Sequence, residues 1–435
     1  MTAVAQASLL TLSAPTRPGL EEATDRLCAR LDRLDQAGFA TLTGEWPGPR
    51  AYPWRRVLVS SGPAEAARRL RGRDGARVLT ALARRDRPMA WLFAGVGDQY
   101  PGLAAGLYAG LPEFRARLDE CLSLLRGHGL DLRPVLYPPG AAAGRSPDLA
   151  ALLDRKADTA PIHRTELAQP VLFAVQYALA KTWQALGLTP SALFGYSVGE
   201  LAAACVAGVF SLPDALGLVV TRARLIDRLP RGGMLAAAAP VEAIAPHLRG
   251  CTVAAIDGPE LTVLAGTEET LTRTGDALAA AGIATRRQPA THAYHSPAMA
   301  PIAEPLREAF AAVPRERPRI PLLSTVTGDW LEADRATDPG YWANQVIAPL
   351  RFADGLTRLW ARGSPVVLEL GPGRGLSRIL LADPGLPADA VLTRTLPGAF
   401  ERTPDRTVVL ETAGRLWAAG IDLDCPPFEI GQGAS

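Results

Sequence analysis

The sequence contains little lysine, cysteine and histidine, and almost no net charge. Only two of its 46 basic residues are lysines, its net charge is +2 over 435 residues, and it has five cysteines and five histidines. Such a balanced charge gives no electrostatic reason to expect binding to nucleic acid or to an anionic membrane. No run reaches the roughly 18 apolar residues of a membrane span. The N-terminus has no basic segment ahead of its apolar patch, so it does not read as a signal peptide.

The cysteines form no recognisable framework. They are odd in number and none stands in a Cys-x-x-Cys pair, which favours neither a disulfide scaffold nor a zinc site. The five positions are Cys28, Cys121, Cys205, Cys251 and Cys425. We therefore expect a reducing, cytoplasmic location, with no bound metal or cofactor.

The order of predicted elements indicates an α/β protein of several units. A small α/β unit comes first and ends in the polar run 84–88, after which a buried strand opens a second unit at Met89. There we expect a surface loop at 136–149, a helix that begins at Gln169 with proline next to it, and a later helix at 342–350.

Residues 233–295 follow the order β-α-β-β-α-β, which is the ferredoxin-like pattern. In this reading Asp257 and Gly258 form the turn of a hairpin. The block interrupts the second unit, so we expect an inserted subdomain.

The pentapeptide Gly195-Tyr196-Ser197-Val198-Gly199 lies between a predicted strand and an apolar predicted helix. This is the pattern of a nucleophile elbow, in which small neighbours allow a tight turn that exposes the serine hydroxyl. The backbone N–H after the serine then faces a developing oxyanion. With 41 glycines in the chain, the pattern alone is only moderately specific.

A serine nucleophile needs a base at neutral pH. His292 and His295 fall together in the motif THAYHS, where the inserted unit returns to the main fold. Clefts are common at such junctions, and position alone supports a catalytic and a structural role equally. His128 and His247 read as surface residues, whereas His163 could cap a helix or line a cleft.

Arg222 lies 25 residues after Ser197 in an otherwise apolar helical stretch. A buried guanidinium requires a partner. That partner could be an internal acid, which the sequence alone slightly favours, or the free carboxylate of a substrate held by two hydrogen bonds. The glycine-rich turns at 95–99 and 371–375 are too short for nucleotide motifs and read as strand-to-helix turns.

Taken together, the motifs resemble those of the malonyl-CoA:acyl carrier protein transacylase family of fatty-acid and polyketide synthesis. The similarity covers most of the chain and keeps the family's order. It rests on LFAGVGDQYPG, AQPVLFAVQYAL, GYSVGELAAACVAGVF, THAYHS, YWANQVIAPLRF and LELGPG. The chain is similar to the acyltransferase domain of a modular polyketide synthase, or to a freestanding enzyme of that kind.

The resemblance implies a domain plan. It implies a hydrolase-like α/β core over residues 88–231 and 296–395, with a ferredoxin-like subdomain at 232–295. Residues 1–87 resemble the linker between ketosynthase and acyltransferase, and residues 396–435 the segment after the acyltransferase. The sequence contains neither a ketosynthase nor a carrier domain, so neighbouring synthase domains are expected partners if the chain is part of a larger protein.

The resemblance also implies a ping-pong reaction. Ser197 would take an acyl group from acyl-CoA and pass it to the phosphopantetheine thiol of an acyl carrier protein. His295 would act as the base, and Gln345 would supply the carbonyl that orients it. The backbone N–H groups of Val96 and Val198 would form the oxyanion hole.

Substrate-binding residues follow from the same resemblance. Arg222 matches the arginine that binds the malonyl carboxylate, and Gln169 matches a glutamine that lines the cleft. Tyr196 stands where the family has histidine. His292 and Tyr294 are close to the family pattern associated with malonyl, and the bulk of Tyr294 would disfavour a branched unit.

Two other functions stay open. A hydrolase that removes stalled acyl groups from carrier proteins would use the same serine and histidine, but Arg222 would then have no carboxylate to bind. A non-catalytic docking domain is the second alternative, and the intact Ser197, His295 and Arg222 argue against it.

Overall fold

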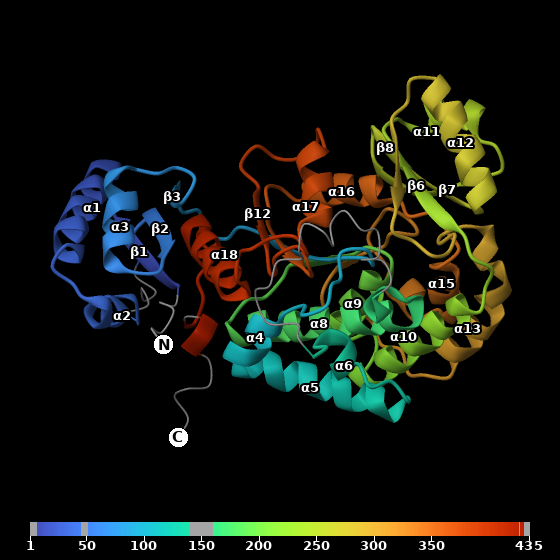
Figure 1. Ribbon diagram of the computed structural model, residues 1–435, viewed down its shortest axis with the longest axis horizontal. Coiled ribbons are helices and arrows are strands. Elements are labelled where there is room, and N and C mark those ends of the chain that lie inside the picture. The colour runs from blue at the N-terminus through green and yellow to red at the C-terminus, as the bar shows by residue number, and fades with distance from the viewer. Residues whose placement is uncertain (1–6, 45–50, 140–159, 426, 430–435) are drawn as a thin grey trace.

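The computed structural model describes residues 7–44, 51–139, 160–425 and 427–429, and its described residues contain three sheets (Figure 1). The first sheet lies in the N-terminal unit, the second in the central core and the third in the inserted unit. Residues 140–149 of the expected surface loop lie outside the described residues.

The N-terminal unit is an antiparallel sheet with helices on one side (Figure 1). Its helix α1 begins after Thr16, whose side chain accepts a hydrogen bond from the Gly19 N–H, and proline opens α3. The strands, in sheet order, are β1 (Ser8–Ala14), β2 (Trp54–Ser60) and β3 (Val78–Leu82), and the helices are α1 (Arg17–Leu31), α2 (Gln36–Gly44) and α3 (Pro63–Arg71).

A parallel five-stranded sheet forms the core. Strands β4 and β11 are buried along their whole length, as expected of a parallel sheet covered by helices on both faces. The sheet order is β10 (Leu322–Leu323), β5 (Ala192–Gly195), β4 (Met89–Phe93), β11 (Val366–Leu370) and β12 (Val391–Arg394).

Helices cover the two faces of this sheet. On one face lie α8 (Thr165–Ala185) and α9 (Val198–Ala207), with α5 (Pro112–Gly127) and α10 (Leu212–Asp227) behind them; on the other lie α16 (Phe352–Trp360) and α17 (Gly375–Ala382). Outside the inserted unit the described chain also has the α-helices α4 (Ala105–Gly110), α6 (Arg133–Leu136), α13 (Ala303–Ala311), α14 (Ala333–Ala336), α15 (Pro339–Asn344) and α18 (Asp405–Ala419).

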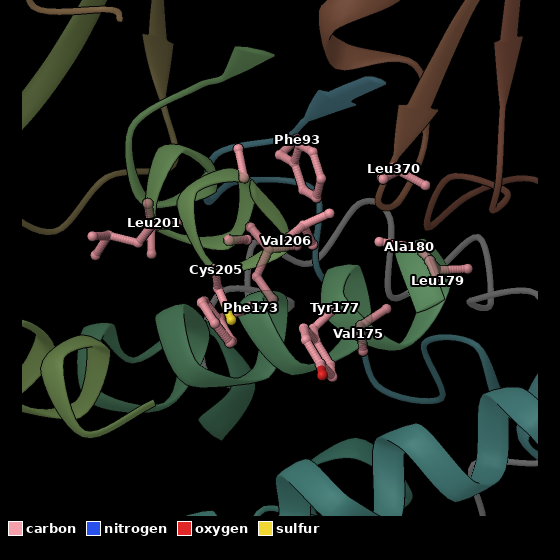
Figure 2. Packing of buried hydrophobic residues seen from close by; sticks show 14 of the residues in the cluster. Phe93, Phe173, Val175, Tyr177, Leu179, Ala180, Leu201, Cys205, Val206 and Leu370 are labelled. Atoms are coloured by element: carbon pink, nitrogen blue, oxygen red, sulfur yellow. The ribbon is translucent and has the colours of Figure 1, made fainter. Parts of the chain in front are cut away.

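Helix α8 runs through the apolar core. Figure 2 shows Phe173 and Tyr177 of α8 beside Cys205 of α9, with Phe93 of β4 above them. The two α8 rings are stacked at a centroid distance of 6.5 Å. The sequence predicted a helix beginning at Gln169, but α8 begins four residues earlier, at Thr165, and Pro170 lies inside it.

The inserted unit is an antiparallel sheet with the predicted ferredoxin-like order β-α-β-β-α-β. Its turn prediction was wrong: Asp257 and Gly258 belong to the strand, Gly258 pairs with Leu261, and Pro259 and Glu260 make the turn. The strands, in sheet order, are β7 (Thr252–Gly258), β8 (Leu261–Gly266), β6 (Gly233–Ala237) and β9 (Thr285–Gln288), and the helices are α11 (Val241–Ile244) and α12 (Glu268–Ala280).

Helix α18 joins the N-terminal unit to the core (Figure 1). Arg55 of β2 donates to the main-chain oxygen of Trp417 at 2.6 Å, and its guanidinium stacks 4.8 Å above the centre of that ring. The same guanidinium pairs with Asp422 at 3.1 Å. Helix α18 and the segment that follows it at Asp422 are therefore part of the packing between the two units.

The helix predicted at 342–350 was confirmed only over 342–344, the last three residues of α15. Helix α15 ends at Asn344, and the chain continues without helical structure to residue 350. None of the helices in the described part of the chain is both long enough and apolar enough to cross a membrane.

Candidate active site

The predicted elbow is a sharp turn between β5 and α9. Ser197 lies between the two elements with φ 55° and ψ −119°. A Cβ atom on Gly195 would lie 2.3 Å from Cα of Glu200, and one on Gly199 would lie 2.2 Å from the carbonyl oxygen of Phe93. Both distances are far below van der Waals contact, so only glycine fits at either position.

Ser197 and His295 face each other across this turn. The Ser197 Oγ atom lies 2.8 Å from Nε2 of His295, and both side chains are buried. His295 also has a positive φ, 54°, and these two are among the five non-glycine residues of the described chain with positive φ. Such conformations cost about 1–3 kcal/mol each and persist only where the surroundings impose them.

The second ring nitrogen of His295 determines its tautomer. Nδ1 lies 3.1 Å from the main-chain oxygen of Gln345 and 3.2 Å from that of Ala348. Both oxygens can only accept, so Nδ1 carries the proton and Nε2 is free to take one from Ser197. The carbonyls are available because α15 ends at Asn344.

The surroundings of His295 keep its ring neutral. Burial, together with the positive charge of Arg222, lowers the pKa of His295 to about 3. At neutral pH the imidazole is therefore unprotonated at Nε2, which is the form that a general base requires.

Gln345 contacts the elbow through its side chain as well. Its Nε2 atom donates to the main-chain oxygen of Ser197 at 2.8 Å and lies 3.4 Å from Oε2 of Glu200. Glu200 is fully buried and also accepts hydrogen bonds from the hydroxyls of Thr325 and Tyr341. Burial raises the pKa of Glu200. Sequence reasoning missed Glu200, although a lone acid at the start of an apolar helix was a usable signal.

Arg222 of α10 is buried and only partly satisfied. Its Nη1 donates to Oε1 of Gln169, whereas Nε and Nη2, and Nε2 of Gln169, have no hydrogen-bond partner in the described part of the chain. In the described part of the chain Arg222 forms no ion pair with an internal acid, the partner that the sequence slightly favoured, although the charge of buried Glu200 acts on it from a distance. Burial lowers the pKa of Arg222 to about 10, so the guanidinium remains charged at neutral pH. A buried cation with free donors is suited to a carboxylate.

Tyr294 and His292 lie in a small polar cluster. Oγ1 of Thr165, the first residue of α8, lies 2.8 Å from the Tyr294 hydroxyl and 3.3 Å from Nδ1 of His292. Gln169 lies four residues further along α8, so one face of this helix contacts both Tyr294 and Arg222. Thr165 was not among the predicted site residues, because the sequence placed the helix start too late.

The two predicted oxyanion donors lie beside the elbow. Val198 is the first residue of α9, where the N–H has no intrahelical acceptor. Val96 lies in the loop after β4, which is fixed by a 2.8 Å hydrogen bond from the Gly97 N–H to Oε1 of Gln99. Neither valine N–H has an acceptor among the residues that the structure describes.

Tyr196 points toward the inserted unit. Its hydroxyl donates to Asp257 of β7, at 2.9 Å from Oδ1 and 3.2 Å from Oδ2. Asp257 is only 3% exposed, and burial raises its pKa to about 7. The residue expected to be a turn is therefore a buried acid in contact with the neighbour of Ser197.

The family comparison agrees with this fold. Residues 90–397 match the family described as "Acyl transferase domain". Over 432 residues the chain is 35% identical to phenolphthiocerol synthesis polyketide synthase type I Pks15/1 of Mycobacterium marinum, covering 98% of this chain and 20% of that protein. Over 423 residues it is 31% identical to mycoketide-CoA synthase of Mycobacterium tuberculosis, covering 95% of this chain and 10% of that protein. The chain thus spans a small part of the length of these relatives.

Solved structures show the same architecture. The acyltransferase domain of ZmaA is 29% identical and superposes with a TM-score of 0.85, covering 98% of this chain and 97% of that one. The acyltransferase domain of SpnD, in complex with 2-(pent-4-yn-1-yl)malonyl, is 32% identical with a TM-score of 0.83, covering 95% and 96%.

The fold and the sequence matches define an α/β acyltransferase with an inserted ferredoxin-like subdomain. More specifically, the chain belongs to the acyl transferase domain family, in the form found in polyketide synthases.

Proposed function

We propose that this acyltransferase moves a malonyl-type extender unit from coenzyme A to the phosphopantetheine thiol of an acyl carrier protein, in the cytoplasm and during polyketide biosynthesis. The observation that carries the proposal is the combination of the 2.8 Å Ser197–His295 contact with the two unpartnered nitrogens of buried Arg222. The first can form an acyl ester, and the second can bind the carboxylate that malonyl has and acetyl lacks.

In the first half-reaction Oγ of Ser197 attacks the thioester carbonyl of malonyl-CoA while Nε2 of His295 takes its proton. The carbon–oxygen bond forms, the carbon–sulfur bond breaks, and the proton passes from His295 to the leaving coenzyme A thiolate. The backbone N–H groups of Val96 and Val198 stabilise the oxyanion of the tetrahedral intermediate.

In the second half-reaction the phosphopantetheine thiol gives its proton to His295 and attacks the ester on Ser197. The new thioester forms, the carbon–oxygen bond breaks, and the proton returns to the serine. The protein needs no cofactor of its own for either half, because acyl-CoA and the carrier protein are both substrates.

Arg222 and Tyr294 would select the acyl unit. The free Nε and Nη2 donors of Arg222 match the two oxygens of a carboxylate, and Gln169 holds the guanidinium in place. Tyr294, fixed by Thr165 and packed edge-on against His292 at 6.0 Å between ring centres, fills space that a substituent on the α-carbon would need. We therefore propose unbranched malonyl as the preferred unit.

The test is the mass of the intact protein after incubation with malonyl-CoA. A stable malonyl adduct, absent from Ser197→Ala and removed on addition of the carrier protein, is the expected result. Immediate release of free malonate without a carrier protein would instead indicate an editing hydrolase. If no acyl-CoA gives an adduct while a carrier protein still binds, the chain is a docking domain and the proposal is wrong.

A further inference from the structure

The contact between Tyr196 and Asp257 links the nucleophile to a different subdomain. Tyr196 directly precedes Ser197, whereas Asp257 lies in β7 of the inserted unit, and the Tyr196 hydroxyl is the only described donor to this buried carboxyl group. Burying an acid with one hydrogen-bond donor is costly, so the contact requires an explanation beyond packing.

The ring of Tyr196 touches a second part of the site. A Cβ atom on Gly95 would lie 2.9 Å from Cδ1 of Tyr196, so the absence of a side chain at Gly95 lets the ring lie against the loop that carries Val96. The ring also meets Phe352 edge-on, with 5.4 Å between ring centres. Tyr196 therefore contacts the oxyanion loop, helix α16 and the inserted unit.

Strand β7 is also bonded to the segment that holds His295. The N–H of Ile256 donates to the oxygen of Leu350 at 2.8 Å, and the N–H of Leu350 donates to the oxygen of Ala254 at 2.9 Å. Leu350 ends the segment 345–350, whose carbonyls accept from the His295 ring and, at Val346, from its backbone N–H at 3.1 Å.

We propose that Tyr196 and Asp257 are positioning residues, whose hydrogen bond sets the reactivity of Ser197 by fixing the elbow to β7. One strand then holds the serine through Asp257 and the histidine through Leu350, so that the distance between the two depends on β7. The inference rests on the proposed function only in taking Ser197 as the nucleophile. It adds that the inserted unit positions the catalytic pair.

The experiment removes the hydrogen bond without leaving a buried group unpaired. Tyr196→Phe deletes only the hydroxyl, and the double variant Tyr196→Phe/Asp257→Val deletes both partners, so any instability caused by an unpaired acid is absent from the double variant. Asp257→Asn keeps an oxygen that can accept from Tyr196. Thermal unfolding of each variant reports on the fold.

Two rates are measured. The first is labelling of Ser197 by an alkyl fluorophosphonate, in which the serine oxygen–phosphorus bond forms, fluoride leaves and His295 takes the serine proton; this rate needs no acyl substrate. The second is single-turnover acylation over a range of malonyl-CoA concentrations. We expect the labelling rate and the maximal acylation rate both to fall about tenfold in Tyr196→Phe and in the double variant. The malonyl-CoA concentration at half-saturation should stay within about twofold, and Asp257→Asn should keep most of the rate.

Tyr108 supplies a control for the loss of a tyrosine–carboxylate hydrogen bond away from the elbow. Its hydroxyl donates to Asp119 at the same distances, 2.9 and 3.2 Å to the two carboxylate oxygens, but between α4 and α5, where Arg133 also pairs with Asp119. Tyr108→Phe should leave both rates unchanged.

Three results would overturn the inference: wild-type rates in a folded double variant, a changed half-saturation concentration with an unchanged maximal rate, or an equal loss in Tyr108→Phe. The proposed function fails separately, when the wild type is labelled by the fluorophosphonate but not by any acyl-CoA. In that case the labelling rates still decide whether Tyr196 and Asp257 position the serine.

Discussion

The side-chain amide of Gln345 donates a 2.8 Å hydrogen bond to the main-chain oxygen of Ser197. The main-chain oxygen of the same glutamine lies 3.1 Å from Nδ1 of His295. One residue thus contacts both members of the pair, the serine through its side chain and the histidine through its backbone. Within the described part of the chain no carboxylate orients the ring of His295, so in the proposed mechanism carbonyl dipoles would face the positive charge that develops on the imidazole.

This arrangement predicts that the Gln345→Ala variant loses only part of the acylation rate. The substitution removes the side-chain contacts with Ser197 and Glu200 but keeps the main-chain carbonyl that holds His295. We expect the acylation rate to fall roughly tenfold, which is what a lost hydrogen bond to a buried group costs. His295→Ala, which removes the proposed base, should lose far more of the acylation rate. Single-turnover acylation followed by intact mass measures both, and equal losses in the two variants would contradict the separation of roles.

Arg222→Ala should distinguish substrates by their charge. With Nε and Nη2 of Arg222 proposed to bind the malonyl carboxylate, loading from malonyl-CoA should lose about 2–4 kcal/mol, which is roughly 30- to 1000-fold. Acetyl-CoA carries no carboxylate, so its loading should change little. Parallel loading assays give the comparison, and similar losses for both substrates would contradict a carboxylate-binding role.

The sequence was informative where chemistry demands a fixed motif. The elbow required glycine at 195 and 199, and the structure shows that any side chain there would collide with the backbone. The ferredoxin-like order of the inserted unit was also predicted, because turn and capping residues separate its strands and helices. The same motifs carried the resemblance on which the proposed roles of Ser197, His295 and Arg222 rest.

Long-range contacts were not predictable in this way. Asp257-Gly258 has the composition of a hairpin turn, but the register of β7 and β8 places the turn two residues later and buries the acid against Tyr196. A helix was predicted over 342–350, whereas the chain turns after Asn344, where carbonyls contact the His295 ring and Leu350 bonds to β7. In both cases tertiary hydrogen bonds override a local preference.

Thr165 should affect the choice of acyl unit. Thr165→Val keeps the shape but deletes the hydroxyl that lies 2.8 Å from the Tyr294 hydroxyl, whereas Thr165→Ser keeps it. A freed Tyr294 ring should admit a methyl group more readily. We therefore expect the ratio of methylmalonyl to malonyl loading to rise about fivefold in Thr165→Val, the value of one hydrogen bond, and to stay unchanged in Thr165→Ser. A competition assay read by mass gives the ratio. An unchanged ratio in Thr165→Val would show that packing alone holds Tyr294.

The rate of acylation should not show the fall near pH 6.5 that protonation of an ordinary histidine base would cause. Because burial and Arg222 lower the pKa of His295 to about 3, the base stays neutral as the pH falls through about 6.5, where an unperturbed histidine would be protonated. The fluorophosphonate labelling rate should therefore change less than about twofold between pH 7 and pH 6 if His295 alone controls it. A half-loss of that rate centred near pH 6.5 would contradict the lowered pKa.

The lowered pKa of His295 also predicts that the free energy of unfolding depends on pH. An unfolded histidine takes up a proton below about pH 6.5, whereas His295 in the folded protein does not until about pH 3. Between these values the unfolded state binds more protons, so the free energy of unfolding falls as the pH falls. His295→Gln removes this dependence, and other titrating groups cancel in the comparison. Urea unfolding of both proteins should show the wild type losing roughly 2 kcal/mol relative to His295→Gln between about pH 7.5 and pH 5. A constant difference over that range would mean that the folded protein protonates His295 at an ordinary pH.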